Sequence, residues 1–261
     1  MLENMLNFNM DMFSLEGKVA LVTGGNTGLG LSYTIAFAKA GAKVAVVSVS
    51  DTDDEVAEIL DAMGESYLFI KADITSEGAP KNIVDQVVSH FGHIDILVNN
   101  AGRCVIEKEV LNFDRPKWDA MVNLNLTAAF EMSHAAAKHF ISQRSGKIIN
   151  IASMFSYLGG QWSPAYSATK HGIVGLTKSY CDELAKFNIQ VTGIAPGYFA
   201  TPMTEATRND EVANEKIVSH IPAERWGDLK DLMGAAVFLA SSASNYINGS
   251  VIDVDGGYLV R

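Results

Sequence analysis

The chain has 261 residues, of which 48% are hydrophobic and 19% charged, a composition typical of a globular protein with a sizeable core. Its net charge of -10 argues against nucleic acid and anionic membranes as partners. The 2 cysteines have no disulfide or metal-ligand spacing, and no apolar run approaches the roughly 20 residues that span a bilayer, so we expect a cytoplasmic protein without a metal site.

The first predicted unit is a strand, a glycine-rich turn and a helix. The apolar run at 18–24 is followed by "TGGNTGLG" and then by helical spacing over 30–41. In that context Gly24 suits a tight turn, Gly28 lets the backbone approach a pyrophosphate, and Gly30 lets the helix pack closely. The free N–H groups at the start of the helix then face the phosphates. An ordinary glycine-rich turn is the alternative for this motif taken alone.

The second predicted strand, 43–49, bears on the choice of cofactor. An acidic residue near its end would hold the ribose 2′-hydroxyl of NAD. The expected position is Ser48, which is not acidic, but no Arg or Lys occurs from 48 to 55 to hold a 2′-phosphate. Three aspartates in the same stretch would repel a phosphate. The sequence therefore favours NAD, and NADP stays open.

The next predicted elements are a helix near 53–63, a strand at 67–73, a helix near 80–91 and a strand at 94–102. The last of these ends in "NNAG", which suits close approach to a cofactor, because ligands of open α/β sheets bind outside the carboxyl ends of strands. Turn formation alone would also explain these asparagines.

A possible proton-transfer site follows the fifth predicted strand. A long helix near 117–142 leads to the strand at 147–153, which ends in Ser153, and a helix near 165–187 follows. Near its start Tyr166 and Lys170 are four positions apart, so their side chains share one face. A phenol suits proton transfer to an alkoxide if its pKa falls, and we expect the neighbouring ammonium to lower it. A surface Tyr–Lys pair is the alternative for these two residues alone.

The chain then continues with a strand at 189–197, a segment at 198–227 that is longer than packing requires, a helix near 228–241 and a strand at 251–257. Long connections of this kind are usually lids or binding loops. The apolar runs lack strict alternation, so both faces of each strand should be buried. We predict an α/β, single-domain, doubly wound Rossmann fold with about seven parallel strands and helices on both faces.

The order of these motifs resembles that of the short-chain dehydrogenase/reductase family over about residues 14–261, which leaves 1–13 as an N-terminal extension. The resemblance rests on the glycine motif, "NNAG", "NLNL", the serine, the Tyr-x-x-x-Lys pair and "PG" at 196–197. It implies an NAD(P)-dependent oxidoreductase acting on CH–OH groups. It also implies that the catalytic residues are Asn125, Ser153, Tyr166 and Lys170.

The resemblance extends to the cofactor. It implies that Asp73 contacts the adenine, that Thr201 holds the nicotinamide carboxamide, and that Lys170 also binds the nicotinamide ribose. The cofactor-binding residues that we predict are Gly24, Asn26, Thr27, Gly28, Leu29, Gly30, Ser48, Asp73, Ile74, Asn100, Ala101, Gly102, Tyr166, Lys170, Pro196, Gly197 and Thr201.

Within the family, the chain is similar to the 2-dehydro-3-deoxy-D-gluconate 5-dehydrogenase and gluconate 5-dehydrogenase branch, which implies a sugar acid or polyol as substrate. Members of that branch often carry arginines shortly after NNAG, whereas here a single arginine precedes "CVIEKEV". The substrate residues that we predict are Arg103, Ser153, Gln161, Trp162 and Tyr198, with Arg208 and Arg261 as further candidates for a carboxylate.

The helices near 117–142 and 165–187 carry small and apolar residues on more than one face. A second subunit would cover the face that does not pack on the sheet, and relatives usually form tetramers through these helices, so we expect a homotetramer. Two alternative functions remain: a 3-oxoacyl carrier-protein reductase and a non-catalytic nucleotide-sensing protein.

Overall fold

The computed structural model describes residues 6, 8–52, 54–63, 66–160 and 162–261. Its central sheet has 7 parallel strands in the order β3-β2-β1-β4-β5-β6-β7. The strands are β1 (Val19–Thr23), β2 (Lys43–Ser48), β3 (Tyr67–Lys71), β4 (Ile96–Asn99), β5 (Gly146–Ile151), β6 (Ile189–Pro196) and β7 (Val251–Val254). The predicted α/β fold is confirmed.

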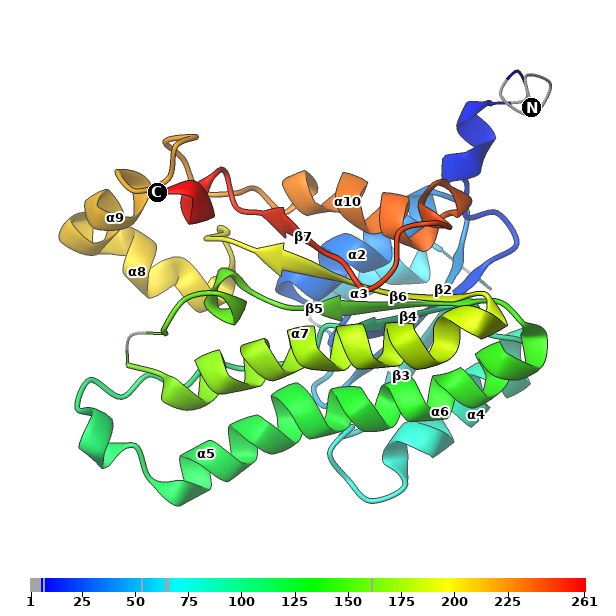
Figure 1. The fold of residues 1–261 in the computed structure, drawn as a ribbon, viewed down its shortest axis with the longest axis horizontal. Coiled ribbons are helices and arrows are strands. Elements are labelled where there is room, and N and C mark those ends of the chain that lie inside the picture. The colour runs from blue at the N-terminus through cyan, green and yellow to red at the C-terminus, as the bar shows by residue number, and fades with distance from the viewer. Residues whose placement is uncertain (1–5, 7, 53, 64–65, 161) are drawn as a thin grey trace.

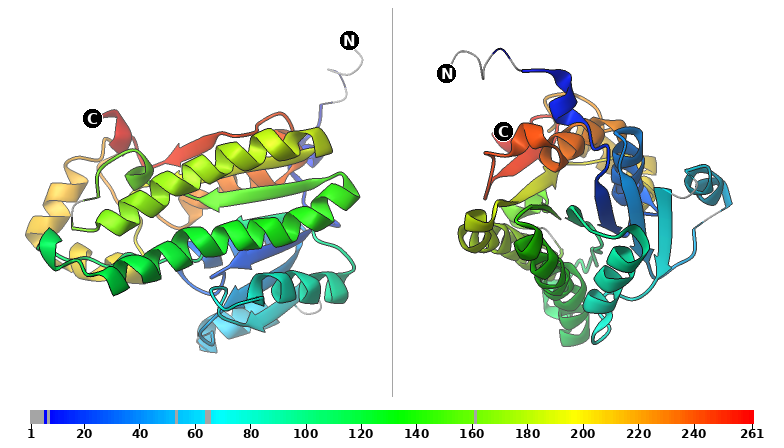
Figure 2. Two further views of the ribbon diagram at one scale, coloured as in Figure 1. Left: turned by 60° about the horizontal axis from the view of Figure 1, so that its bottom comes forward. Right: turned by 90° about the vertical axis from the view of Figure 1, so that its right-hand side faces the viewer.

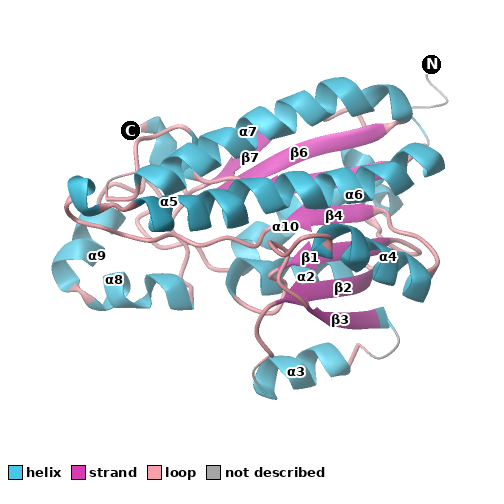
Figure 3. Ribbon diagram, turned by 90° about the horizontal axis from the view of Figure 1, so that it is seen from below, coloured by secondary structure: helices cyan, strands magenta, loops and turns pink. Residues whose placement is uncertain are grey.

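Helices cover both faces of this sheet (Figures 1 and 3). The helices are α2 (Gly28–Lys39), α3 (Asp54–Asp61), α4 (Ala79–Phe91), α5 (Arg115–Val122), α6 (Ala128–Gln143), α7 (Pro164–Leu184), α8 (Glu205–Asn209), α9 (Glu211–Val218) and α10 (Lys230–Ala240). One face packs against α4, α6 and α7, and the other against α2 and α10. Strands β1, β4, β5 and β6 are buried along their whole length, as their apolar runs predict.

The sequence order reverses between β1 and β4, so a crevice is expected at the carboxyl ends of these two strands. That end of the sheet faces α8 and α9, on the left in Figure 1. The 3-10 turn Met10–Phe13 lies beyond the opposite end, where the chain leads away from the sheet (Figure 2). No helix in the described part of the chain is long and apolar enough to cross a membrane.

Two predicted elements differ from the structure. The single helix expected near 117–142 is interrupted by a π-helical turn at Asn123–Thr127, where the backbone widens between α5 and α6. The segment 198–227, expected as a loop, contains the short helices α8 and α9. The Asp210 side chain starts α9 by accepting a hydrogen bond from the Ala213 N–H, a local cap that is easily overlooked in so short a helix.

Candidate active site

The glycine-rich turn between β1 and α2 has the shape of a phosphate cradle. A Cβ atom added to Gly30 would lie 2.0 Å from the Gly24 carbonyl oxygen, so only glycine allows this close packing. Gly28 has a φ of +52°, and a Cβ there would meet open space. Thr27, the N-cap of α2, gives no side-chain cap, so the first N–H groups of the helix are left for a ligand. The residues of this turn therefore fit a dinucleotide pyrophosphate.

The end of β4 supports this turn directly. The Asn100 amide donates hydrogen bonds to the carbonyl oxygens of Thr23, at 2.8 Å, and Gly24, at 3.1 Å. The hydroxyl of Thr23 in return accepts the backbone N–H groups of Asn100 and Ala101. Asn99 instead belongs to a buried network with Ser133 and Asn150. Of the two asparagines, Asn100 is therefore the one that shapes the cradle.

The other predicted cofactor residues lie along the same edge. Asp73 follows β3 and caps a turn by accepting hydrogen bonds from the Thr75 N–H and hydroxyl. The Ile74 side chain packs in the core. At the end of β6, a Cβ on Gly197 would lie 2.7 Å from the Asp255 Cα, so this glycine lets the strand ends meet. Thr201 begins the 3-10 turn that leads into the α8 region.

Ser153 and Tyr166 come together beyond the end of β5. The Ser153 hydroxyl accepts the Phe155 N–H at 3.2 Å, and this residue caps a short 3-10 turn. Phe155 also packs edge-on against the Tyr166 ring, with ring centroids 6.2 Å apart. Burial raises the pKa of Tyr166 to about 12, and a hydrogen bond from Ser153 opposes this rise. The expectation of a lowered Tyr166 pKa is therefore wrong for this structure, because desolvation of the phenolate dominates.

Lys170 is one helical turn further along α7. Its ammonium donates a hydrogen bond to the Ile151 carbonyl oxygen at 2.6 Å and lies 5.6 Å from the centroid of the Tyr166 ring. Burial lowers the pKa of Lys170 to about 8. The Ser156 hydroxyl donates to the Lys170 carbonyl oxygen, which holds this part of α7 against the end of β5. Lys170 is thus buried and Tyr166 half-buried beside it, and the interpretation as a surface pair is wrong.

The π-helical turn between α5 and α6 places Asn125. Its amide oxygen accepts the Arg103 N–H at 2.9 Å, and its amide nitrogen donates to the Arg103 carbonyl oxygen at 2.9 Å. The same nitrogen lies 3.3 Å from the Thr169 hydroxyl oxygen on α7. Asn125 therefore joins the segment after β4 to the helix that carries Tyr166 and Lys170.

Cys104 is a residue of this region that the sequence patterns did not indicate. Burial raises its pKa, while a hydrogen bond from Ser163 and the charge of Lys170 oppose the rise. Ionised Cys104 would raise the pKa of Tyr166 and of Tyr198, so the thiol is close to the proton-transfer residues. A single cysteine without a partner cysteine or histidine nearby in the sequence gives no pattern that would have identified it.

The predicted substrate residues differ in their surroundings. Tyr198 packs edge-on against the rings of Trp226 and Tyr258, with both centroid distances 5.4 Å. Trp162 is exposed and has a φ of +66°. Gln161 lies outside the described residues. Tyr198, Trp226 and Tyr258 thus form one aromatic cluster after the end of β6.

The candidate arginines differ in their surroundings. Arg103 is exposed, and its side chain has no partner among the described residues. Arg208 on α8 is half-buried and donates to the Thr201 carbonyl oxygen at 3.2 Å, while its Nε is buried without a partner. The Arg261 guanidinium donates to the Ser219 carbonyl oxygen of its own chain.

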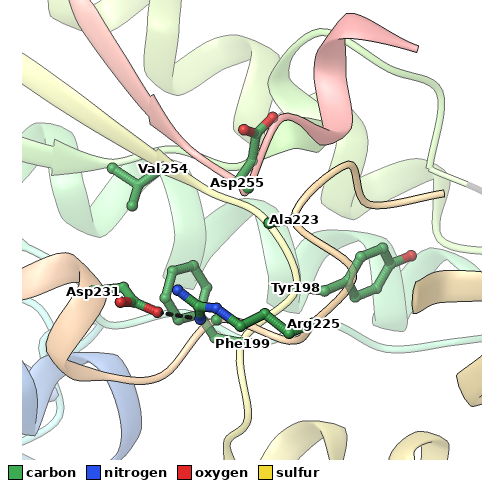
Figure 4. A pocket seen from close by; sticks show the side chains of 9 residues that line it. Tyr198, Phe199, Ala223, Arg225, Asp231, Val254 and Asp255 are labelled. Atoms are coloured by element: carbon green, nitrogen blue, oxygen red, sulfur yellow. Dashed lines mark hydrogen bonds and ion pairs between the residues drawn. The ribbon is translucent and has the colours of Figure 1, made fainter. Parts of the chain in front are cut away.

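A cavity of about 160 Å³ lies behind Tyr198, between the ends of β6 and β7 and the segment that follows α9 (Figure 4). The guanidinium of Arg225 reaches across it to the carboxylate of Asp231 at 2.6 Å. This ion pair links the segment after α9 to the first turn of α10, so it anchors one end of the 198–227 segment.

Comparisons with known proteins agree with this geometry. The sequence profile of the family described as short chain dehydrogenase matches residues 18–212. The uncharacterized oxidoreductase YgcW of Escherichia coli K12 is 58% identical over 260 residues, covering 100% of this chain and 99% of that protein. The 2-dehydro-3-deoxy-D-gluconate 5-dehydrogenase of the same organism is 47% identical over 253 residues, covering 97% of this chain and 99% of that protein.

Among solved structures, the gluconate 5-dehydrogenase from Burkholderia cenocepacia, in complex with NADP and tartrate, has a TM-score of 0.90. It is 35% identical, and the match covers 96% of this chain and 98% of that one.

Proposed function

The chain belongs to the short-chain dehydrogenase family, and on that premise we propose that it interconverts a secondary alcohol and a ketone of a sugar acid or polyol. The observation that carries the proposal is the clustering of Ser153, Tyr166 and Lys170 beside the glycine cradle, at one edge of the sheet. The relatives named for gluconate derivatives support the class of substrate.

The bound nicotinamide cofactor supplies the hydride for ketone reduction and accepts it in alcohol oxidation. Hydride addition to the carbonyl carbon leaves an alkoxide, which must take a proton. With a pKa of about 12, the Tyr166 hydroxyl is protonated near neutral pH and has that proton to give. Ser153 orients the substrate oxygen by a hydrogen bond, and Lys170 stabilises the phenolate that remains. In alcohol oxidation the proton moves in the opposite direction.

A kinetic screen tests this function. Gluconate, deoxygluconate derivatives, polyols and their keto forms are supplied with each nicotinamide cofactor, and cofactor absorbance is followed. We expect turnover with at least one sugar acid or its keto form. The absence of turnover with all of these compounds would contradict the proposal. Turnover with an added 3-oxoacyl thioester and with none of the sugar compounds would also contradict it.

The first prediction is a preference for NAD(H), which rests on the surroundings of the β2 end. The Ser48 hydroxyl accepts the Ser50 N–H at 3.4 Å, and the Asp51 carboxylate pairs with Lys71 at 2.7 Å. Lys71 is opposite Ser48 in the register of β2 and β3 and is the nearest cation to it in the sheet. Its ammonium is already paired with Asp51. An Asp51 carboxylate at the ribose edge would repel a 2′-phosphate.

We therefore expect a higher kcat/KM with NADH than with NADPH. Ser48→Asp should increase the ratio, whereas Asp51→Asn should lower it by releasing Lys71. A higher kcat/KM with NADPH, the form of the cofactor in the Burkholderia cenocepacia structure, would refute the prediction.

The second prediction concerns the substrate carboxylate. Arginine suits a carboxylate because its planar fork matches both oxygens. Arg103 follows the NNAG motif and has no side-chain partner among the residues described, so we expect Arg103→Ala to lose activity on a sugar acid but not on the matching polyol. Unchanged activity on the acid would exclude Arg103 and favour Arg208, whose half-buried guanidinium is next to Thr201.

The third prediction is a homotetramer that buries the outer faces of α6 and α7. Phe130 is 45% exposed and stacks on His134, with the ring of Tyr180 from α7 edge-on to it. The two helices lie side by side on one face of the molecule (Figure 3). Sedimentation at micromolar concentration should give four subunits, and Phe130→Arg should reduce the number. A monomeric parent would contradict this assembly.

A further inference from the structure

A second cavity lies at the opposite edge of the sheet, where the parallel strands begin. It has a volume of about 210 Å³, and its lining includes Lys18, Asp95, Ser145, Lys147 and Gln190. Lys147 is the second residue of β5 and Gln190 the second residue of β6, whereas Ser153 and Tyr166 lie past the other end of β5. The cavity is therefore separate from the candidate active site.

Lys147 is a buried cation with only neutral hydrogen-bond partners. The residue is 8% exposed, and its ammonium donates to the Ser244 hydroxyl at 3.1 Å and to the Asn245 amide oxygen at 2.9 Å. It forms no ion pair with any carboxylate in the described part of the chain. Burial, together with the charge of Lys18, lowers the pKa of Lys147 to about 8. A buried charge of this kind is costly unless a counter-ion accompanies it.

Gln190 gives a second, independent observation. It pairs with Lys147 in the register of β5 and β6, so the two side chains point to the same face of the sheet. Gln190 is 7% exposed and lines the cavity, yet its carboxamide has no hydrogen-bond partner among the residues that are described. Its amide atoms are not sealed in the protein interior, so the N–H group is open to a ligand or to water in the cavity.

The carboxylate that lines the cavity is already engaged. One oxygen of Asp95 pairs with Lys18 at 3.2 Å, and the other accepts the Val19 N–H at 2.9 Å and lies 3.1 Å from the His93 ring nitrogen. Lys147 therefore gains little neutralisation from it. Two lysines and one aspartate line the cavity, and both oxygens of the aspartate already have partners. The lining therefore carries an excess of positive charge, although the net charge of the chain is -10.

We infer that this cavity is a binding site for a small oxyanion, a phosphate or a carboxylate, held by the Lys147 ammonium and the Gln190 amide. An oxyanion would compensate the buried charge and satisfy the unpaired amide at once, with the Ser145 hydroxyl as a further donor. The volume is roughly seven times the ~30 Å³ that one water occupies in the liquid, so the anion and some hydration fit.

Inorganic phosphate is the first probe, and the thermal unfolding midpoint of the full chain is the readout. The titration is carried out with saturating NADH, so that the glycine cradle is occupied and cannot take up the phosphate. We expect a saturable rise in the midpoint, because a ligand that binds only the native state stabilises it. Sodium chloride at equal ionic strength should not reproduce the rise. Acetate in place of phosphate shows whether the site prefers carboxylates.

Two variants and one control assign the effect to this cavity. Lys147→Met removes the charge and should weaken phosphate binding about tenfold or more, the loss expected for a charge-assisted contact. Gln190→Leu keeps the lysine and should weaken it by a smaller factor, which preserves the test if the first variant does not fold. Lys39→Met, on the exposed end of α2, should bind phosphate like the parent. The inference fails if neither phosphate nor acetate acts beyond chloride, or if Gln190→Leu responds like the parent.

Discussion

Tyr166→Phe should reduce kcat by about 10² to 10⁴ while leaving the dissociation constant of NADH nearly unchanged. The substitution removes the one hydroxyl that is placed to give a proton to the alkoxide. The ring keeps its edge-on contact with Phe155, so the local packing should survive. Stopped-flow measurement of turnover and fluorescence titration of NADH separate the two effects.

The matched control is Tyr180→Phe, the same chemical change further along α7, at a residue that packs against Phe130. This variant should turn over at close to the parental rate. Ordinary turnover by Tyr166→Phe would remove the proton-transfer assignment. A large loss of NADH affinity would mean that the hydroxyl also supports the cofactor site.

Much of the fold was predictable because the strands are mainly apolar and the glycine turn after β1 has a simple steric reason. The cradle illustrates this: its motif predicts that Gly30 lets the helix pack closely, and a Cβ at Gly30 would lie 2.0 Å from the Gly24 carbonyl oxygen. The meeting of Ser153 with Tyr166 was also predictable, because the carboxyl ends of parallel strands share one edge of the sheet.

Other features depend on contacts that no local pattern encodes. The π-helical turn that places Asn125 has the composition of an ordinary helix, and only its contacts with Arg103 and Thr169 distinguish it. The direction of the Tyr166 pKa shift depends on how much water the folded chain excludes, which spacing alone cannot give. The Asp51–Lys71 pair joins positions 20 residues apart through the pairing of β2 with β3.

Loss of Lys170 should affect both proton transfer and cofactor binding. Its ammonium is buried, bonded to the Ile151 carbonyl oxygen and close to the Tyr166 ring. A positive charge at this position favours the phenolate over the neutral phenol, so removal of the ammonium should raise the Tyr166 pKa still further.

Lys170→Met should therefore change the pH dependence of alcohol oxidation as well as its size. In the parent, the rate should rise with pH as Tyr166, whose pKa is about 12, loses its proton, because the phenolate accepts the substrate proton. Without the cation the phenolate loses its stabilisation, so the rising limb should move to higher pH and kcat at pH 8 should fall by about 10² or more. The NADH dissociation constant should also rise, because the ammonium is expected to bind the nicotinamide ribose.

Lys178→Met, at an exposed position on the same helix, is the control and should keep the parental profile. An unshifted limb in Lys170→Met would show that the ammonium does not tune Tyr166, and normal NADH affinity would show that it does not hold the ribose.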